Sequence, residues 1–300
     1  MTMLSTDQTP RHADVVQVNK NRQSSGDRAV AVSTHALLIL WSAIVLIPLL
    51  WVLMTSFKST QEVLSGSPLA LPTKLHWENY SNAWEQAGIG KWFLNTVVVV
   101  GSSLVIVMVL GAMCAYVLAR YSFPGNRIIY YSMLAGLTFP IFLAVVPLFF
   151  TLKNIGLLNT LPGLIMTYVA FALPFTVFFL HSFFGQLPNE IYEAAQVDGA
   201  TEWRTFFQVM LPMAKPGMAA VSIFNFLGLW NQFLLPVALN TEPNNYVLTQ
   251  GMASFASSAG YSVDFGALFA AIVITIIPVL VVYVIFQRQL TGSVSQSTVK

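Results

Sequence analysis

The sequence predicts an all-α membrane protein with six transmembrane helices and a polar helical hairpin on the cytoplasmic side. Of its 300 residues, 56% are hydrophobic and only 9% are charged, whereas soluble domains carry about 25% charged residues. Six apolar stretches are long enough to cross a bilayer core of about 30 Å, which takes roughly 20 helical residues. They run over residues 33–55, 93–119, 128–150, 161–184, 217–239 and 265–286.

Residues 1–30 precede the first predicted span and are polar, rich in Ser, Gln and Arg. They lack the apolar core of a signal peptide, so we expect a disordered cytoplasmic tail followed by a helix that stays in the membrane. Residues 31–300 are then expected to form one six-helix transmembrane domain. The single cysteine, Cys114, excludes an intrachain disulfide.

The distribution of Lys and Arg predicts which side of the membrane each loop faces. Ten of these residues lie on the side of the two termini and of the loops after the second and fourth spans, and four lie on the other side. Because cytoplasmic loops carry the excess of Lys and Arg, both termini are expected in the cytoplasm. The short loop from Arg120 to Arg127 carries the most weight, since the polar tail inflates the total.

Prolines in the spans predict bends, because each removes a backbone hydrogen bond from its helix. The alternative is that proline is simply more frequent in membrane helices. The prolines within or at the edges of predicted spans are Pro48, Pro140, Pro147, Pro174, Pro236 and Pro278.

The hairpin, residues 188–214, is a polar segment between the fourth and fifth spans, and its pattern predicts two short amphipathic helices. Apolar residues recur at helical spacing at Ile191, Ala194 and Ala195, and again at Trp203, Phe206, Phe207 and Met210. The helices are expected to meet at Asp198-Gly199, where glycine suits a left-handed residue. Folded structure here favours docking of a partner; the alternatives are a hairpin lying on lipid headgroups or a plain linker.

One motif in the hairpin resembles the EAA loop of the membrane subunits of ATP-binding-cassette importers. It reads Glu193-Ala194-Ala195, three residues, Gly199, nine residues, Val209, one residue, Leu211-Pro212. Val209 departs conservatively from the usual Ile. In that family the loop is the coupling helix, which sits in a groove of the ATPase subunit, so the resemblance implies a type I importer permease fold. It also implies ATPase coupling by Glu193, Ala194, Ala195, Asp198, Gly199, Trp203, Leu211 and Pro212.

Further segments resemble the carbohydrate importers of the maltose type, and the six-span count and short N-terminus resemble their second permease subunit. They are Thr55-Ser56-Phe57-Lys58, Glu78-Asn79-Tyr80, Ala115-Tyr116-Val117-Leu118-Ala119-Arg120, Gly156-Leu157-Leu158-Asn159, Trp230-Asn231-Gln232-Phe233 and Gln287-Arg288 with Gly292-Ser293-Val294. This resemblance implies a prokaryotic plasma-membrane protein that pairs with a second permease subunit, two ATPase subunits and an extracytoplasmic sugar-binding protein. It extends to permeases for N-acetylglucosamine or its short oligomers.

The sequence lacks the signatures of several other functions. It has no G-x-x-x-x-G-K-[ST] phosphate loop, so we expect a partner subunit to hydrolyse ATP-Mg and this chain to bind no cofactor. No catalytic or metal-ligating residues are predicted, and partners are expected to be protein subunits and membrane lipid, not nucleic acid. All charged residues can be placed outside the spans, which argues against a proton-coupled carrier. A stand-alone secondary sugar carrier or channel, and a membrane-embedded enzyme, remain the alternatives.

Two groups of residues are candidates for contact with substrate or binding protein. Asn225, Trp230, Asn231 and Gln232 offer an aromatic face and planar amides for a sugar, although a Trp near a helix end is also a common interface anchor. Residues 241–264 contain no Lys or Arg and are expected outside the membrane. The resemblance implies that Tyr246, Phe255 and Tyr261 there contact the binding protein; the alternative is a loop packed on its own subunit.

Overall fold

A computed structural model describes residues 25–258 and 264–295 of the chain, which form helices joined by turns and loops, with no strand. Residues 1–50 and 51–300 form two compact units, which are described separately. The long helix α1, Ser25–Thr55, contains the whole first predicted span. Residues 25–30 of the predicted tail are therefore helical, and residues 1–24 lie outside the described residues.

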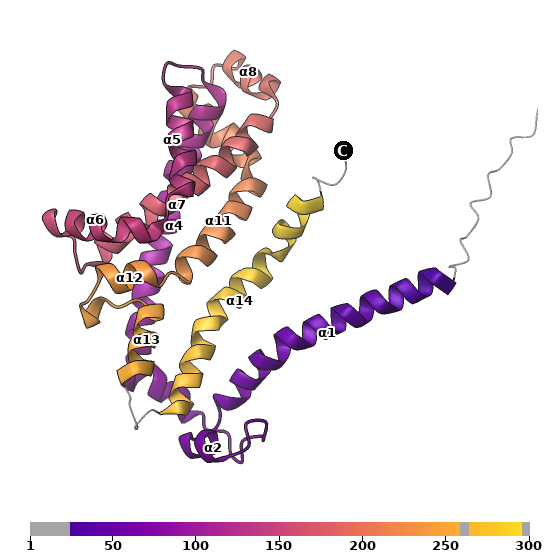
Figure 1. The fold of residues 1–300 in the computed structure, drawn as a ribbon. Coiled ribbons are helices and arrows are strands. Elements are labelled where there is room, and N and C mark those ends of the chain that lie inside the picture. Colours follow the sequence, from indigo (N-terminus) through magenta and orange to yellow (C-terminus); the bar gives the residue numbers. More distant parts are fainter. Residues whose placement is uncertain (1–24, 259–263, 296–300) are drawn as a thin grey trace, which may run out of the picture. The chain divides into compact units, whose positions relative to one another are not determined.

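Among the described residues, four helices are long and apolar enough to cross a membrane by themselves. They are α1, α4 (Ile89–Arg120), α7 (Leu161–Gln186) and α14 (Phe265–Ser295). Two bent helix pairs raise the number to six if each counts as one span. The predicted all-α membrane fold is confirmed, and Figure 1 shows its helices. Shorter elements are α2 (Thr60–Ser65), α3 (Glu78–Ser81) and η1 (Asn82–Gln86).

The third predicted span is broken into α5 (Asn126–Thr138) and α6 (Ile141–Asn154), and the chain bends by 106° between them. Phe139 at the break is extended, and Pro140 follows it. Proline has no backbone N–H and disfavours helical conformation in the residue before it. The bend expected from Pro140 is therefore present, whereas Pro48, Pro147, Pro174 and Pro278 lie inside continuous helices.

The fifth predicted span is also interrupted, because α11 (Lys215–Trp230) ends before the short helix α12 (Leu234–Leu239). Pro236 explains part of this break, since it has no N–H to donate to the carbonyl of Gln232 four residues earlier. That carbonyl instead accepts a hydrogen bond from the Thr249 hydroxyl at 2.7 Å. The break therefore ties the end of this span to the segment that follows it.

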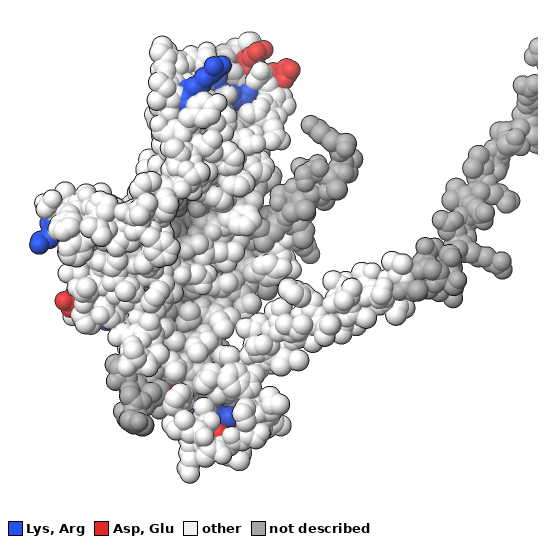
Figure 2. Space-filling view, viewed as in Figure 1, with Lys and Arg blue, Asp and Glu red and all other residues white. Residues whose placement is uncertain are grey.

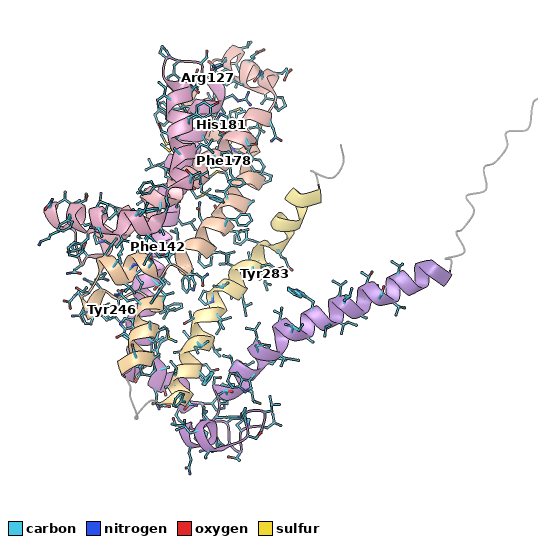
Figure 3. All side chains as sticks on the ribbon, viewed as in Figure 1. Arg127, Phe142, Phe178, His181, Tyr246 and Tyr283 are labelled. Carbon is cyan, nitrogen blue, oxygen red and sulfur yellow. The ribbon has the colours of Figure 1, made fainter. Side chains whose placement is uncertain are left out.

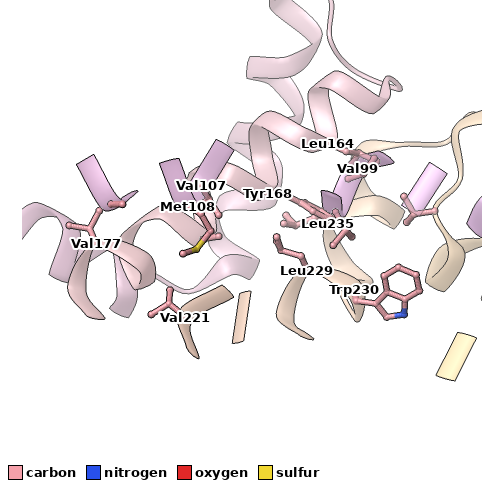
Figure 4. Close-up of a cluster of buried hydrophobic side chains, with 14 of the residues drawn as sticks. Val99, Val107, Met108, Leu164, Tyr168, Val177, Val221, Leu229, Trp230 and Leu235 are labelled. Atoms are coloured by element: carbon pink, nitrogen blue, oxygen red, sulfur yellow. The ribbon is translucent and has the colours of Figure 1, made fainter. Parts of the chain in front are cut away.

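The core of residues 51–300 is centred on α4 and α7, which pack along most of their lengths. Small residues allow this close approach: the Ser103 hydroxyl donates to the Ile165 carbonyl at 3.4 Å, and Gly111 faces Thr176. Packing of small residues is the usual basis of helix association in membranes. Figure 4 shows side chains of α4, α7, α11 and α12 that meet in this core.

Residues 241–264, expected as a loop, are partly helical. They include η3 (Pro243–Asn245) and α13 (Leu248–Ser258), and α13 packs on α4 and α14. The buried Leu248 amide donates to the Thr96 hydroxyl at 2.7 Å. Gly251 lies directly against the Trp92 ring, where a Cβ would come within 2.1 Å. The segment is thus fastened to one end of α4.

Candidate functional site

The hairpin has the two-helix form that its sequence predicts. Helix α8 (Asn189–Val197) ends at a turn in which Gly199 has a φ of +75°, the left-handed region that glycine tolerates. Thr201 then caps α9 (Glu202–Arg204), its hydroxyl accepting from the Arg204 amide at 3.4 Å. The chain continues through the wide π-helical turns of η2 (Thr205–Met210) and α10 (Leu211–Met213) into α11.

The inner face of the hairpin packs against the transmembrane helices. Phe206 and Met210 are buried, and the Phe206 ring lies 5.0 Å from that of Tyr116 in α4 and 6.3 Å from that of Phe184 in α7. Ala195 is buried too, while Leu211 and Pro212 are half-buried. These three predicted coupling residues therefore help hold the hairpin in place.

The other predicted coupling residues, Glu193, Ala194, Asp198, Gly199 and Trp203, are exposed, and Trp203 also borders a cavity that Tyr116 and Val117 of α4 line. Val197 beside them is 87% exposed and Trp203 is 63% exposed. The Trp203 ring stacks on that of Phe207, with ring centres 5.9 Å apart. Apolar side chains grouped on a polar surface are typical of a protein contact site. Figure 2 shows charged side chains gathered at the end of the molecule that carries α8.

Hydrogen bonds that the sequence did not predict attach the hairpin to α4. Arg120, the last residue of α4, donates to the Leu187 carbonyl at 2.6 Å and also to the Asn189 side chain. The Glu202 carboxylate accepts hydrogen bonds from the hydroxyls of Tyr121 and Tyr192, the latter at 2.9 Å. Burial and the hydrogen bond to Glu202 raise the pKa of Tyr121, so its hydroxyl stays protonated and remains a donor.

The four sugar-path candidates fall into two pairs. Asn225 and Gln232 line one cavity of about 320 Å³ between α7 and α11. Asn225 is nearly buried and donates to the Thr176 hydroxyl at 2.8 Å. Trp230 and Asn231 do not line this cavity. Trp230 is 3% exposed, with its indole N–H directed to the Thr275 carbonyl at 3.3 Å, and Asn231 is exposed but donates to the Leu227 carbonyl.

The aromatic lining of this cavity comes from residues that the sequence analysis did not select: Phe171, Phe175 and Phe224. Phe175 and Phe224 have ring centres 6.3 Å apart. Aromatic residues make up 13% of the sequence, so the sequence alone does not mark these three phenylalanines. Only the packing of α7 against α11 shows that they line a common cavity. The cavity combines aromatic faces with two side-chain amides.

The three residues of this chain that are predicted to contact the binding protein differ from one another in their surroundings. Tyr246 is half-buried, with its ring 6.4 Å from that of Trp92, and its carbonyl accepts from Asn95 at 2.9 Å. Phe255 packs partly on the hydrophobic core. Tyr261 lies outside the described residues. Within the described part of the chain, no group of three or more His, Cys, Asp or Glu side chains could hold a metal ion.

Comparison with known proteins places this arrangement in a family. Residues 107–296 match the family described as binding-protein-dependent transport system inner membrane component. A diacetylchitobiose uptake system permease protein of Streptomyces coelicolor is 70% identical over 275 residues, covering 92% of this chain and 91% of that protein. A trehalose transport system permease protein of Mycobacterium tuberculosis is 33% identical, covering 85% of this chain and 92% of that one.

Solved structures share the fold. A chain of a bacterial ABC transporter involved in the import of the acidic polysaccharide alginate superposes with a TM-score of 0.77 at 21% identity. The match covers 88% of this chain and 98% of that one. The chain therefore belongs to the inner membrane component family of binding-protein-dependent transport systems, and it is a non-catalytic permease subunit of an ABC importer with the type I fold.

Proposed function

We propose that this chain forms half of an ATP-driven sugar import path. Its partners are a second permease subunit in a heterodimer, two ATPase subunits that hydrolyse ATP-Mg, and an extracytoplasmic sugar-binding protein. The observation that carries the proposal is the hairpin, which buries Phe206 and Met210 against the transmembrane core while exposing Val197 and Trp203. A surface of this kind is suited to receive a partner and to pass its movement inward.

The hairpin and both termini are proposed to face the cytoplasm, where ATP is present. The Lys and Arg count supports this orientation. Residues 31–300 are proposed as the transmembrane permease domain. Residues 241–264 then face the binding protein, with Tyr246, Phe255 and Tyr261 as the proposed contacts.

The proposed substrates are N-acetylglucosamine oligomers such as diacetylchitobiose. The diacetylchitobiose permease that is 70% identical over most of both chains supports this class. The cavity between α7 and α11 is chemically suitable, because phenyl rings pack on the apolar faces of pyranose rings. The half-buried Gln232 amide matches hydroxyl and acetamido groups, since an amide both donates and accepts hydrogen bonds, whereas the Asn225 NH2 already donates to the Thr176 hydroxyl.

Uptake by a strain deleted for this chain tests the substrate class. The strain and its complemented parent are compared over N-acetylglucosamine, diacetylchitobiose, trehalose and maltose, each radiolabelled. The proposal predicts a loss of diacetylchitobiose uptake that complementation restores. Unchanged diacetylchitobiose uptake, with a loss confined to trehalose or maltose, would contradict the assignment.

Gln232→Ala is expected to raise the KM for sugar uptake about fivefold, because it removes a hydrogen-bonding side chain worth roughly 1 kcal/mol from the cavity. Asn231→Ala is the matched control, since Asn231 precedes it but lies outside the cavity. The KM of each variant is measured from the concentration dependence of uptake, in cells that hold equal amounts of the chain in the membrane. Equal KM values for the two variants would remove Gln232 from the sugar path.

A further inference from the structure

The hairpin is joined covalently to α7 and α11 but not to α4. The join to α7 runs through Leu187 and Pro188, which are both extended, so the helix does not continue into the hairpin. The join to α11 is a bend of 76°. Both joins are bent or extended backbone, and residues at element ends of this kind are where hinge motion is absorbed. Other contacts must therefore decide whether the hairpin moves together with the transmembrane helices.

The Glu202 carboxylate makes such a contact. It receives one hydroxyl from Tyr121, which directly follows α4, and another from Tyr192, which belongs to α8. Both halves of the hairpin are thereby drawn to the end of α4. Burial and the hydrogen bond to Glu202 raise the pKa of Tyr192 as well as that of Tyr121. Hydrogen bonds to a carboxylate are about twice as strong as those between neutral groups.

The other end of α4 holds the segment that follows the fifth span. The Lys91 ammonium donates to the Asn244 side chain at 2.7 Å, and Asn95 donates to the carbonyls of Asn244 and Tyr246 at 3.0 and 2.9 Å. Asn95 and Arg120 are separated by about 38 Å at the α-helical rise of about 1.5 Å per residue. In Figure 3, Arg127 lies at the top of the view and Tyr246 lies well below it.

We propose that Glu202, Tyr121 and Tyr192 form a latch that fastens the hairpin to α4, and that α4 carries movement between the latch and residues 243–251. The proposal rests on the proposed function, in which the hairpin meets the ATPase and residues 241–264 meet the binding protein. Together with the Arg120 contacts and the buried Phe206 and Met210, the latch limits swinging of the hairpin about Leu187-Pro188. Displacement at one end of α4 then reaches the other end, because an unbroken 32-residue helix packed along α7 moves as a rigid body.

Glu202→Ala tests the latch in the complete importer, reconstituted in liposomes with its sugar-loaded binding protein. Glu190→Ala is the matched control, because Glu190 is an exposed carboxylate in the same hairpin. We expect the ATPase subunits to co-purify normally with both variants. Stimulation of ATP hydrolysis by the loaded binding protein should fall about fivefold or more in Glu202→Ala, in the range of typical coupling energies. The control should keep the parent's stimulation.

Two further variants separate a latch from a general loss of stability. Glu202→Gln keeps an acceptor oxygen for a tyrosine hydroxyl and should retain intermediate stimulation. Tyr121→Phe combined with Glu202→Ala should behave like Glu202→Ala alone, because residues in one network are not additive. Additive losses accompanied by lower membrane levels would overturn the latch in favour of a structural role.

Hydrogen exchange at residues 243–251 measures the far end of α4 directly. Binding of a non-hydrolysable ATP analogue to the parent importer should change exchange in this segment, and Glu202→Ala should lose that change. An unchanged response in Glu202→Ala, or full stimulation by the binding protein, would overturn the latch. Glu193→Lys distinguishes the two proposals: if it uncouples the importer and Glu202→Ala does not, only the latch fails. If Glu193→Lys is also fully coupled, the docking face itself is wrong.

Discussion

Gly199→Val is expected to abolish sugar uptake while the chain still reaches the membrane. Gly199 has a φ of +75°, and no atom lies within 4 Å of the position that a Cβ would take. The penalty is therefore one of backbone conformation and not of space. A residue with a Cβ costs about 1–2 kcal/mol in this region, and a β-branched residue is worse. The turn must then adopt another backbone conformation, which changes the direction of α8. Uptake is measured against the amount of chain in the membrane.

Gly199→Asn is the control for this prediction, because asparagine adopts left-handed conformations more readily than other residues with a Cβ. It should keep most of the transport activity. Glu193→Lys should lose transport as Gly199→Val does, by reversing a charge on the exposed face proposed for the ATPase. Full uptake by Gly199→Val or Glu193→Lys at parental membrane levels would rule out a coupling role for the hairpin.

Gly111→Leu is expected to lower the amount of folded chain severely. Even a Cβ at this position would come within 2.4 Å of Thr176 Cγ2. The Thr176 hydroxyl cannot easily move, since it donates to the Ala172 carbonyl at 2.9 Å and accepts from Asn225 at 2.8 Å. Overpacking of a close interface costs about 1–3 kcal/mol, and here it separates the two helices that form the centre of the core. Immunoblots of membranes and thermal aggregation of the purified importer measure the loss.

Gly101→Leu is the matched control on the same helix, because no atom lies within 4 Å of its Cβ position. It should accumulate like the parent. Parental levels and stability of Gly111→Leu would show that α4 and α7 do not pack as closely as described.

The sequence was sufficient for the features that depend on local pattern. Apolar length predicted the positions of the long helices, and Pro140, one of the six prolines at which a bend was predicted, lies at the sharp bend between α5 and α6. The periodicity of residues 188–214 predicted the hairpin and its glycine turn. Each of these follows from neighbouring residues, so no knowledge of tertiary contacts was needed.

The features that depend on distant residues were not predictable. Tyr121 and Glu202 are 81 positions apart, and neither carries a pattern that marks it as a partner of the other. Residues 241–264 have turn-like residues, yet α13 forms there because α4 offers Thr96 and Trp92 as contacts. Trp230 was selected for its aromatic face, but packing against α14 buries it. The three phenylalanines of the cavity were hidden among many other aromatic residues.

Uptake of radiolabelled diacetylchitobiose under a protonophore tests whether ATP drives import through this subunit. Cells are held at constant ATP while the proton gradient is collapsed, and a parallel sample is depleted of ATP with the gradient intact. If ATP drives import, uptake continues in the first sample and stops in the second. Uptake that stops on collapse of the gradient while ATP remains constant, or that continues after ATP is depleted, would contradict ATP-driven import.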